Sequence, residues 1–220
     1  MTKLQCVVIS IFPEMFKALT EFGVVGRAFA SGLLELTLLN PRDYAPAPRR
    51  RVDERPYGGG PGMVMMAEPL YQAIQAAKMQ LGDETKVIYL SPQGPRFNQN
   101  KAAAMVTYQK LILLCGRYEG VDQRLLDQWI DEQVSLGDFV VSGGELPAMM
   151  LLDAVARLVP GVLGDPESVL QESFQNGNEL DYPVYTEPKV WQDQAVPEVL
   201  LSGHHKNIKA WREMQKIAKK

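Results

Sequence analysis

Two glycine-rich turns flank one short unit of this chain and carry most of its candidate chemistry. The first turn is the segment GRYEG from Gly116, and the second is the segment SGG from Ser142. Glycine lets the backbone approach a ligand closely. Turns of this kind at the ends of buried strands indicate a pocket lined by main-chain N–H and C=O groups. The polar residues at its rim would be Arg117, Tyr118, Glu119 and Ser142. Ordinary strand-to-helix connections in an α/β domain would give the same pattern, so both interpretations stay open.

A third segment with binding character follows the apolar run Lys86–Leu90, which predicts a buried strand. The strand delivers Ser91, Pro92, Gln93 and Gly94 at its carboxyl end. Ligands bind at that end of the strands in parallel α/β sheets. We therefore expect this strand end and the two glycine turns to enclose one ligand.

The segment YGGGPG from Tyr57 is too rich in glycine to be helical. It lacks the Gly-Lys-Ser/Thr of a phosphate-binding P-loop and the spacing of a dinucleotide-binding turn. A phosphoryl-transfer enzyme built on this loop is therefore disfavoured. The segment is expected to be flexible or closely packed backbone.

Basic residues gather in two places although the net charge is −3. One cluster includes Arg49, Arg50 and Arg51, and the other includes Lys206, Lys209 and Arg212. Such clusters are typical of contacts with nucleic-acid phosphates, and they also occur on solvated protein surfaces.

Apolar periodicity predicts the elements that position these residues. Strands are expected at Cys6–Phe12, Leu33–Leu39, Lys86–Leu90 and Leu111–Cys115, with the last one central. Helices are expected from Pro13 towards Phe22, over Ala67–Leu81, from Asn98 or Asn100 to Thr107, from Asp122, and over Pro147–Val159 and Gly203–Lys220. This alternation predicts a parallel α/β domain over residues 1–160. A polar linker over residues 161–186 and a small helical module over residues 187–220 would follow.

The composition is that of a globular protein, with 46% hydrophobic and 22% charged residues. No run of 18 apolar residues and no signal-peptide pattern is found, so we expect a cytoplasmic protein without a membrane partner. Cys6 and Cys115 lie in apolar runs and are expected to be buried thiols.

Six motifs together resemble one family, the bacterial tRNA (guanine-N1)-methyltransferases that act on guanosine 37, beside the anticodon. They are SIFPEMF from Ser10, VDERPYGGGPGMVMM from Val52, YLSPQG from Tyr89, LCGRYEGVDQR from Leu114, SLGDFVVSGGELPAM from Ser135 and LSGHH from Leu201. The resemblance covers residues 4 to about 212 and implies the SPOUT fold. In that fold the parallel sheet is tied in a trefoil knot, and the enzymes are homodimers with composite active sites.

The resemblance also implies that S-adenosylmethionine is held in the knot. The matching positions are Tyr89, Leu90, Ser91, Pro92, Gln93, Gly116, Tyr118, Glu119, Ser135, Leu136, Gly137, Phe139, Val141, Gly143, Gly144 and Pro147. A requirement for Mg²⁺ is implied as well, with Glu119 as the nearest candidate ligand. The sequence has no independent metal signature.

Methylation of guanine N1 requires a base that removes the N1 proton and a donor that stabilises charge at O6. The resemblance assigns the O6 side to Arg157. It assigns the base to an aspartate that directly precedes Ser-Phe, where this chain has Glu172. Asp181 and Asp53 are rival carboxylates, and a surface acid is the alternative interpretation of Glu172.

Two departures from the family bear on function. Glutamate at position 172 keeps the carboxylate but adds a methylene, and a catalytically silent RNA-binding protein that has lost its base is the alternative function. The family's C-terminal helical domain also runs on past the segment that ends here at Lys220. We therefore expect a shortened tRNA-binding module with weaker affinity.

Overall fold

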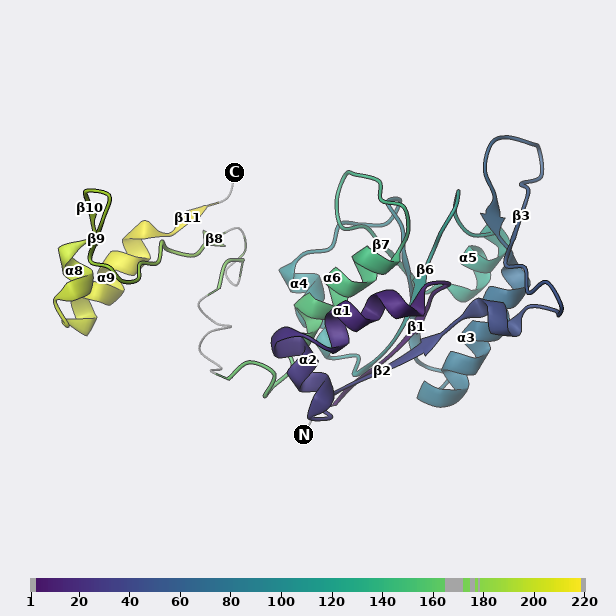
Figure 1. Ribbon diagram of the computed structural model, residues 1–220, viewed down its shortest axis with the longest axis horizontal. Helices are drawn as coiled ribbons and strands as arrows, with labels where there is room; N and C mark the ends of the chain where they lie inside the picture. The colour runs from purple at the N-terminus through teal and green to yellow at the C-terminus, as the bar shows by residue number, and fades with distance from the viewer. Residues whose placement is uncertain (1–2, 165–171, 175–176, 178, 219–220) are drawn as a thin grey trace. The chain divides into compact units, whose positions relative to one another are not determined.

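The computed structural model describes residues 3–164, 172–174, 177 and 179–218. The chain divides into two compact units, residues 1–164 and residues 165–220, and each is described by itself (Figure 1). The predicted linker over residues 161–186 falls in part on residues 165–171, 175–176 and 178, which lie outside the described ones. Within the described ranges, no helix is both long and apolar enough to cross a bilayer.

The N-terminal unit is built on a five-stranded sheet with the order β2-β1-β6-β5-β7. All neighbouring strands are parallel, which confirms the predicted sheet type. The strands are β1 Leu4–Ile9, β2 Leu34–Leu39, β5 Lys86–Leu90, β6 Lys110–Cys115 and β7 Glu132–Val134. Strand β6 lies between β1 and β5, so the prediction of a central strand at Leu111–Cys115 is confirmed.

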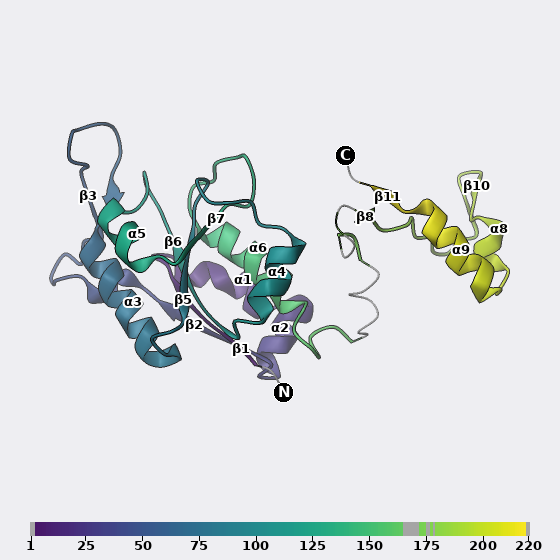
Figure 2. The same cartoon turned by 180° about the vertical axis from the view of Figure 1, so that it is seen from behind.

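Helices cover both faces of this sheet (Figure 2). On one face lie η1 Pro13–Phe16, α1 Lys17–Thr20, α2 Gly23–Ala30, α4 Gln99–Val106 and α6 Glu145–Ala156, and on the other lie η2 Pro41–Tyr44, α3 Ala67–Leu81 and α5 Gln123–Trp129. Side chains of β6 alternate between the two layers. Leu111 and Leu113 pack towards α6, while Ile112 and Leu114 pack towards α3. A strand that is buried on both faces reads as a continuous apolar run, which explains why β6 is recognisable in the sequence.

The segment after β1 corrects the prediction of a strand to Phe12 and one helix towards Phe22. Strand β1 ends at Ile9, and the Phe12 backbone N–H donates a hydrogen bond to Ser10 Oγ at 2.9 Å, which turns the chain. The helical region then breaks at Phe22, which has extended backbone, and Gly23 follows with φ of +69°. A separate helix, α2, therefore replaces the end of the predicted one.

The C-terminal unit combines two small hairpins with two helices. Its elements are β8 Glu179–Leu180, β9 Val190–Trp191, β10 Gln194–Ala195, α8 Glu198–Leu201, α9 His205–Gln215 and β11 Ile217–Ala218. The predicted helix Gly203–Lys220 is thus too long. Lys216 takes an extended conformation, and Ile217 pairs with Leu180 in an antiparallel ladder. Tertiary pairing here overrides the helical periodicity of the sequence.

Asp122, from which a helix is predicted, is the N-cap of α5 and accepts a hydrogen bond from the Arg124 backbone N–H at 3.0 Å. The hydrogen bond from the Arg124 side chain to Asp122 lowers the pKa of this carboxyl. Asp122→Ala is expected to lower the free energy of unfolding by about 1 kcal/mol at neutral pH. A carboxyl with a lowered pKa stabilises the fold above its unfolded-state pKa, and this stabilisation is lost as the pH falls through the folded-state value. Urea titrations of both proteins should therefore converge in acid, and a pH-independent difference would contradict this origin.

Candidate functional site

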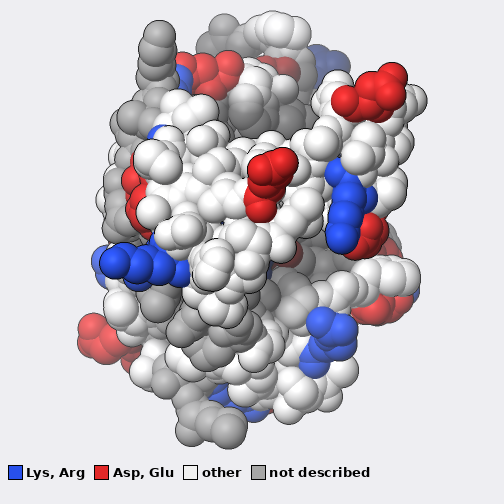
Figure 3. All heavy atoms as spheres, turned by 90° about the vertical axis from the view of Figure 1, so that its left-hand side faces the viewer, with Lys and Arg blue, Asp and Glu red and all other residues white. Residues whose placement is uncertain are grey.

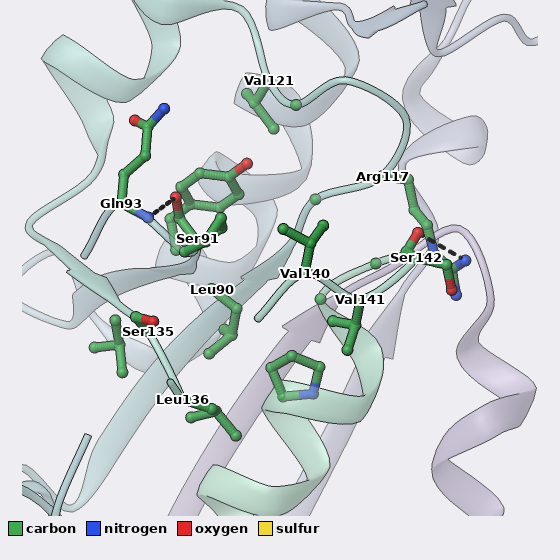
Figure 4. Close-up of a pocket in the computed structure, with 18 of the residues that line it drawn as sticks. Leu90, Ser91, Gln93, Arg117, Val121, Ser135, Leu136, Val140, Val141 and Ser142 are labelled. Atoms are coloured by element: carbon green, nitrogen blue, oxygen red, sulfur yellow. Dashed lines mark hydrogen bonds between the residues drawn. The ribbon is translucent and has the colours of Figure 1, made fainter. Parts of the chain in front are cut away.

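The carboxyl ends of three neighbouring strands meet at one edge of the sheet. In the ladder, Leu90 at the end of β5 lies beside Cys115 of β6 on one side and beside Val134 of β7 on the other. The three segments that follow enclose a pocket of about 360 Å³ (Figure 4). This volume lies within the range of roughly 300–1,000 Å³ that is usual for small-molecule sites.

Every residue that the sequence assigns to cofactor binding lines this pocket. From the end of β5 come Tyr89, Leu90, Ser91, Pro92 and Gln93, and from the turn after β6 come Gly116, Tyr118 and Glu119. The segment after β7 and the first turn of α6 supply Ser135, Leu136, Gly137, Phe139, Val141, Gly143, Gly144 and Pro147. Arg117 and Ser142, which the sequence places at the rim, also line the pocket. The structure thus brings the predicted set together, while the role of each residue stays a prediction.

Sequence reasoning missed the remaining lining residues, which are Gly120, Val121, Gln123, Leu126, Val134 and Val140. Val121 and Leu126 are buried among the side chains of the α3 layer, so the sequence shows them only as core positions. Gly120 closes the first glycine turn, and that position could have been included from the motif. Val140 is 85% exposed although it lines the pocket, and no local pattern distinguishes it from its neighbours.

Glycine is required where the two turns approach each other. A Cβ on Gly144 would lie 2.7 Å from Cys115 Cα and 3.0 Å from the Gly116 nitrogen, both of which are backbone atoms. The Gly144 backbone N–H donates to the Gly116 carbonyl at 2.8 Å. A Cβ on Gly116 would lie 2.7 Å from the Tyr89 hydroxyl. The pocket wall is therefore bare main chain because side chains do not fit there.

The glycine-rich loop from Tyr57 reaches the same site. It connects β3 Asp53–Glu54 with β4 Val64–Met65, and the Glu119 backbone N–H donates to the Met63 carbonyl at 2.9 Å. Gly62 packs so closely on the Glu119 side chain that a Cβ would overlap it. At this end the loop is the closely packed backbone that one of the two sequence-based interpretations expects. Its other end is open, since a Cβ on Gly58, Gly59 or Gly60 would have no neighbour within 4 Å.

The two predicted catalytic residues of the N-terminal unit, Asp53 and Arg157, do not line the pocket. Asp53 is half-buried on β3. Arg157 follows α6 at its C-terminal end, while Glu145 starts the helix at the pocket. Because a helix rises by about 1.5 Å per residue, the Cα atoms of Glu145 and Arg157 lie roughly 18 Å apart.

The remaining carboxylates, Glu172 and Asp181, belong to the C-terminal unit. Two hydrogen bonds connect the segments that carry them. The Asp181 N–H donates to Ser173 Oγ at 3.0 Å, and the Phe174 N–H donates to the Glu179 carbonyl at 2.7 Å. Both candidate bases therefore flank one hydrogen-bonded loop.

The predicted RNA-binding residues are exposed in both clusters. Lys206, Lys209 and Arg212 follow one another at a spacing of three and form a stripe on α9. In the other cluster, Arg50 pairs with Asp43 at 3.0 Å and Arg51 pairs with Glu54 at 3.2 Å. On the face drawn in Figure 3, basic and acidic side chains are interspersed and do not form one broad basic patch.

A metal centre has little support in the part of the chain that the structure describes. No group of three or more His, Cys, Asp or Glu side chains gathers there. Among the residues that line the pocket, Glu119 is the one acid. Proteins usually bind Mg²⁺ through one or two carboxylates together with water and substrate phosphates, so Glu119 alone does not define a metal site.

This geometry defines a class of protein: an α/β domain with a pocket of small-molecule size, formed by loops at the carboxyl edge of a parallel sheet. Residues 4–220 match the family model described as tRNA (Guanine-1)-methyltransferase TrmD. The chain belongs to this family, which confirms the identification made from its motifs.

Individual relatives agree with the family model. Two of them, from Pseudoalteromonas translucida and Aeromonas hydrophila, are named tRNA (guanine-N(1)-)-methyltransferase and are 56% and 57% identical to this chain. Each alignment covers 96% of this chain, and the relatives are covered to 83% and 85%. Among solved structures, the tRNA (m1G37) methyltransferase from Aquifex aeolicus is similar with a TM-score of 0.79 and 39% identity. That alignment covers 95% of this chain and 87% of the other.

Proposed function

We propose that this protein is a cytoplasmic enzyme that transfers a methyl group from S-adenosylmethionine to N1 of guanosine 37 in tRNA. The observation that carries the proposal is the pocket of three main-chain loops, in a chain that belongs to a family of tRNA (guanine-1)-methyltransferases. The position within tRNA is inferred from the similar structure from Aquifex aeolicus, which is that of an m1G37 enzyme.

The pocket fits S-adenosylmethionine in size and chemistry. Its walls combine apolar side chains, such as Leu136 and Val141, with the main chain of the glycine turns, where a Cβ would overlap neighbouring protein atoms. An adenine ring could lie on the apolar wall while backbone groups recognise its edge. When bound, the cofactor would supply a methyl group that is already activated as a sulfonium.

Residues of this chain would then accept the proton of the guanine and stabilise the negative charge that develops on it. Glu172 would accept the proton from N1, which frees the nitrogen lone pair to form the new N–CH₃ bond. The Arg157 guanidinium would stabilise the negative charge that develops at O6. Asp181, on the same hydrogen-bonded loop as Glu172, is the first rival for the role of base, and Asp53 is the second.

We further propose a homodimer in which each site combines the knotted pocket of one subunit with the loop and helical module of the other. Two observations support it. Arg157 is too far along α6 to reach the pocket end of its own helix. The same layer of the unit exposes large apolar side chains, which often mark protein–protein contacts. They are Phe12, Phe22, Leu146 and Met150, each at least 46% exposed.

Methylation of two tRNA transcripts tests the proposed function directly. Under single-turnover conditions, the wild-type protein should methylate a transcript with guanosine at position 37 and leave a matched adenosine-37 transcript unmodified. Tight binding of both transcripts without any methylated product would favour the alternative function, a catalytically silent RNA-binding protein. Glu172 in place of the family's aspartate is the observation that favours this alternative.

Contacts between the stripe on α9 and tRNA phosphates should make binding sensitive to salt. Lys209→Ala is expected to weaken tRNA binding and to reduce the slope of log K against log salt by about 0.7–0.9. Filter binding over a range of salt concentrations measures both quantities. Lys78→Ala on α3, where the side chain bonds the Asp83 carbonyl at 3.0 Å, is the control and should keep the wild-type slope. Equal slopes for both variants would show that Lys209 on α9 does not contact tRNA phosphates.

A further inference from the structure

Glu145 is a fully buried carboxylate at the first position of α6. A buried charge is costly unless it is paired and hydrogen-bonded. Arg117 Nε donates to Glu145 Oε2 at 2.8 Å, and Ser10 Oγ donates to Glu145 Oε1 at 2.6 Å. The N-terminal end of a helix also favours negative charge. Both oxygens thus have partners, and the two partners come from distant parts of the chain.

The Arg117 side chain is itself held on several sides and is only 16% exposed. Its Nη1 donates to the Ser142 carbonyl at 3.2 Å, and Figure 4 shows the side chain extending towards Ser142. The guanidinium lies 4.6 Å from the centre of the Phe12 ring. A Cβ on Gly143 would overlap the Arg117 side chain, so this glycine makes room for it.

These contacts connect the two glycine turns that form the pocket wall. Arg117 belongs to the first turn, whereas Ser142, Gly143 and Glu145 belong to the second turn and to the start of α6. Ser10 adds the end of β1. Arg117 is also the one cation among the lining residues described, yet its contacts are with the protein itself. Arg117 therefore holds together the two turns that form the pocket wall.

We propose that Glu145 is a positioning residue that holds the two pocket turns, through Arg117, in the arrangement that binds the cofactor. Glu145 does not line the pocket, so it would act on cofactor affinity without touching the reacting atoms. The expected change in S-adenosylmethionine affinity rests on the proposed function. The expected change in the stability of the two turns does not depend on that function.

Glu145→Gln tests the proposal with two independent measurements. The amide can still accept from Ser10, but it carries no charge to balance Arg117. Hydrogen exchange of the ligand-free protein should become at least about tenfold faster at the amides of residues 116–121 and 142–144, because local opening costs less. Calorimetry should show S-adenosylmethionine binding about tenfold or more weaker, with kcat at saturating cofactor close to the wild-type value.

Glu132→Gln is the matched control. Glu132 is 17% exposed in its side chain and pairs with Lys86 at 2.9 Å and with Lys101, at the opposite end of β5 and β7 from the pocket turns. This variant should lose stability while keeping wild-type exchange in the two turns and wild-type cofactor affinity. If Glu145→Gln behaves in the same way, Glu145 is merely structural and the proposal is wrong.

Arg117→Lys keeps the test decisive if Glu145→Gln does not fold. Lysine retains the charge but lacks the planar fork that reaches Glu145 and Ser142 together. It should reproduce the faster exchange and the weaker binding, and wild-type values for both would overturn the proposal. The double variant should be little worse than either single one, because both changes break one contact. If the wild-type protein binds no S-adenosylmethionine, the proposed function fails, and the exchange data still decide the role of Glu145.

Discussion

Glu172→Gln is expected to slow single-turnover methylation of a guanosine-37 transcript by about 10²- to 10⁴-fold, the usual contribution of a positioned general base. Glutamine keeps the size and hydrogen-bonding capacity of the side chain but cannot take up the N1 proton. Binding of tRNA should change little, because the substitution removes no basic residue. Quench-flow measurement of the chemical step under saturating cofactor separates these two effects.

Asp181→Asn is the matched comparison, because Asp181 lies on the same hydrogen-bonded loop. Its effect should be much smaller than that of Glu172→Gln if Glu172 is the base. Glu172→Asp should retain a measurable rate, since it keeps the carboxylate and introduces the aspartate that the resemblance to the family implies at this position. A Glu172→Gln variant as fast as wild type, together with a slow Asp181→Asn variant, would transfer the role of base to Asp181.

Gly144→Ala is expected to weaken S-adenosylmethionine binding strongly, although alanine is the smallest possible addition. Gly144 has an ordinary φ of −76°, so backbone strain is not the reason. The added Cβ would meet backbone atoms of Cys115 and Gly116 within 3.0 Å, and these atoms cannot rotate away. Separating the turns would also stretch the hydrogen bond from Gly144 to Gly116. Overpacking of this kind costs about 1–3 kcal/mol. A loss of this size corresponds to about 5- to 150-fold in the dissociation constant.

Gly164→Ala is the control for this substitution. Among the residues that the structure describes, none lies within 4 Å of a Cβ added to Gly164, and its φ is not positive, so the variant should bind the cofactor as wild type does. Calorimetric titration of both variants measures the dissociation constants, and circular dichroism confirms that each is folded. Wild-type affinity in Gly144→Ala would mean that the close approach of the two turns does not shape the cofactor site.

Much of the N-terminal unit was predictable because its signals are local. The strand Lys86–Leu90 and the helix Ala67–Leu81 have the predicted bounds, since their apolar patterns and the glycine after the helix are local features of the sequence. The glycine motifs also identified the pocket lining, because only glycine fits where two backbones meet. By contrast, α2 and β11 depend on a break at Phe22 and on pairing with Leu180, and neither has a strong local signature.

The burial of the Glu145 carboxylate could not be predicted from the sequence. In the sequence it is an acidic residue in the first turn of a helix, which is common and usually exposed. Its partners, Ser10 and Arg117, are brought to it by the crossing of three separate segments. The predicted catalytic residues are equally hard to connect with the pocket from the sequence alone, because Arg157 and Glu172 lie outside the motifs that form it. In the homodimer that we propose, their assembly depends on a second subunit, which no local pattern specifies.

Subunit mixing tests the central claim most directly, because Gly144→Ala damages the pocket and Glu172→Gln removes the base. Differently tagged variants are co-expressed, and the mixed dimers are assayed for methylation of the guanosine-37 transcript. If each site joins the pocket of one subunit to the carboxylate of the other, a mixed dimer has one intact site. The isolated mixed dimer should then regain roughly half of the wild-type activity, and an unfractionated statistical mixture roughly a quarter. The assay is run at a cofactor concentration well below the dissociation constant of the Gly144→Ala variant. Activity no greater than the sum of the two homodimeric variants would then show that pocket and base act within one subunit, and would contradict the account.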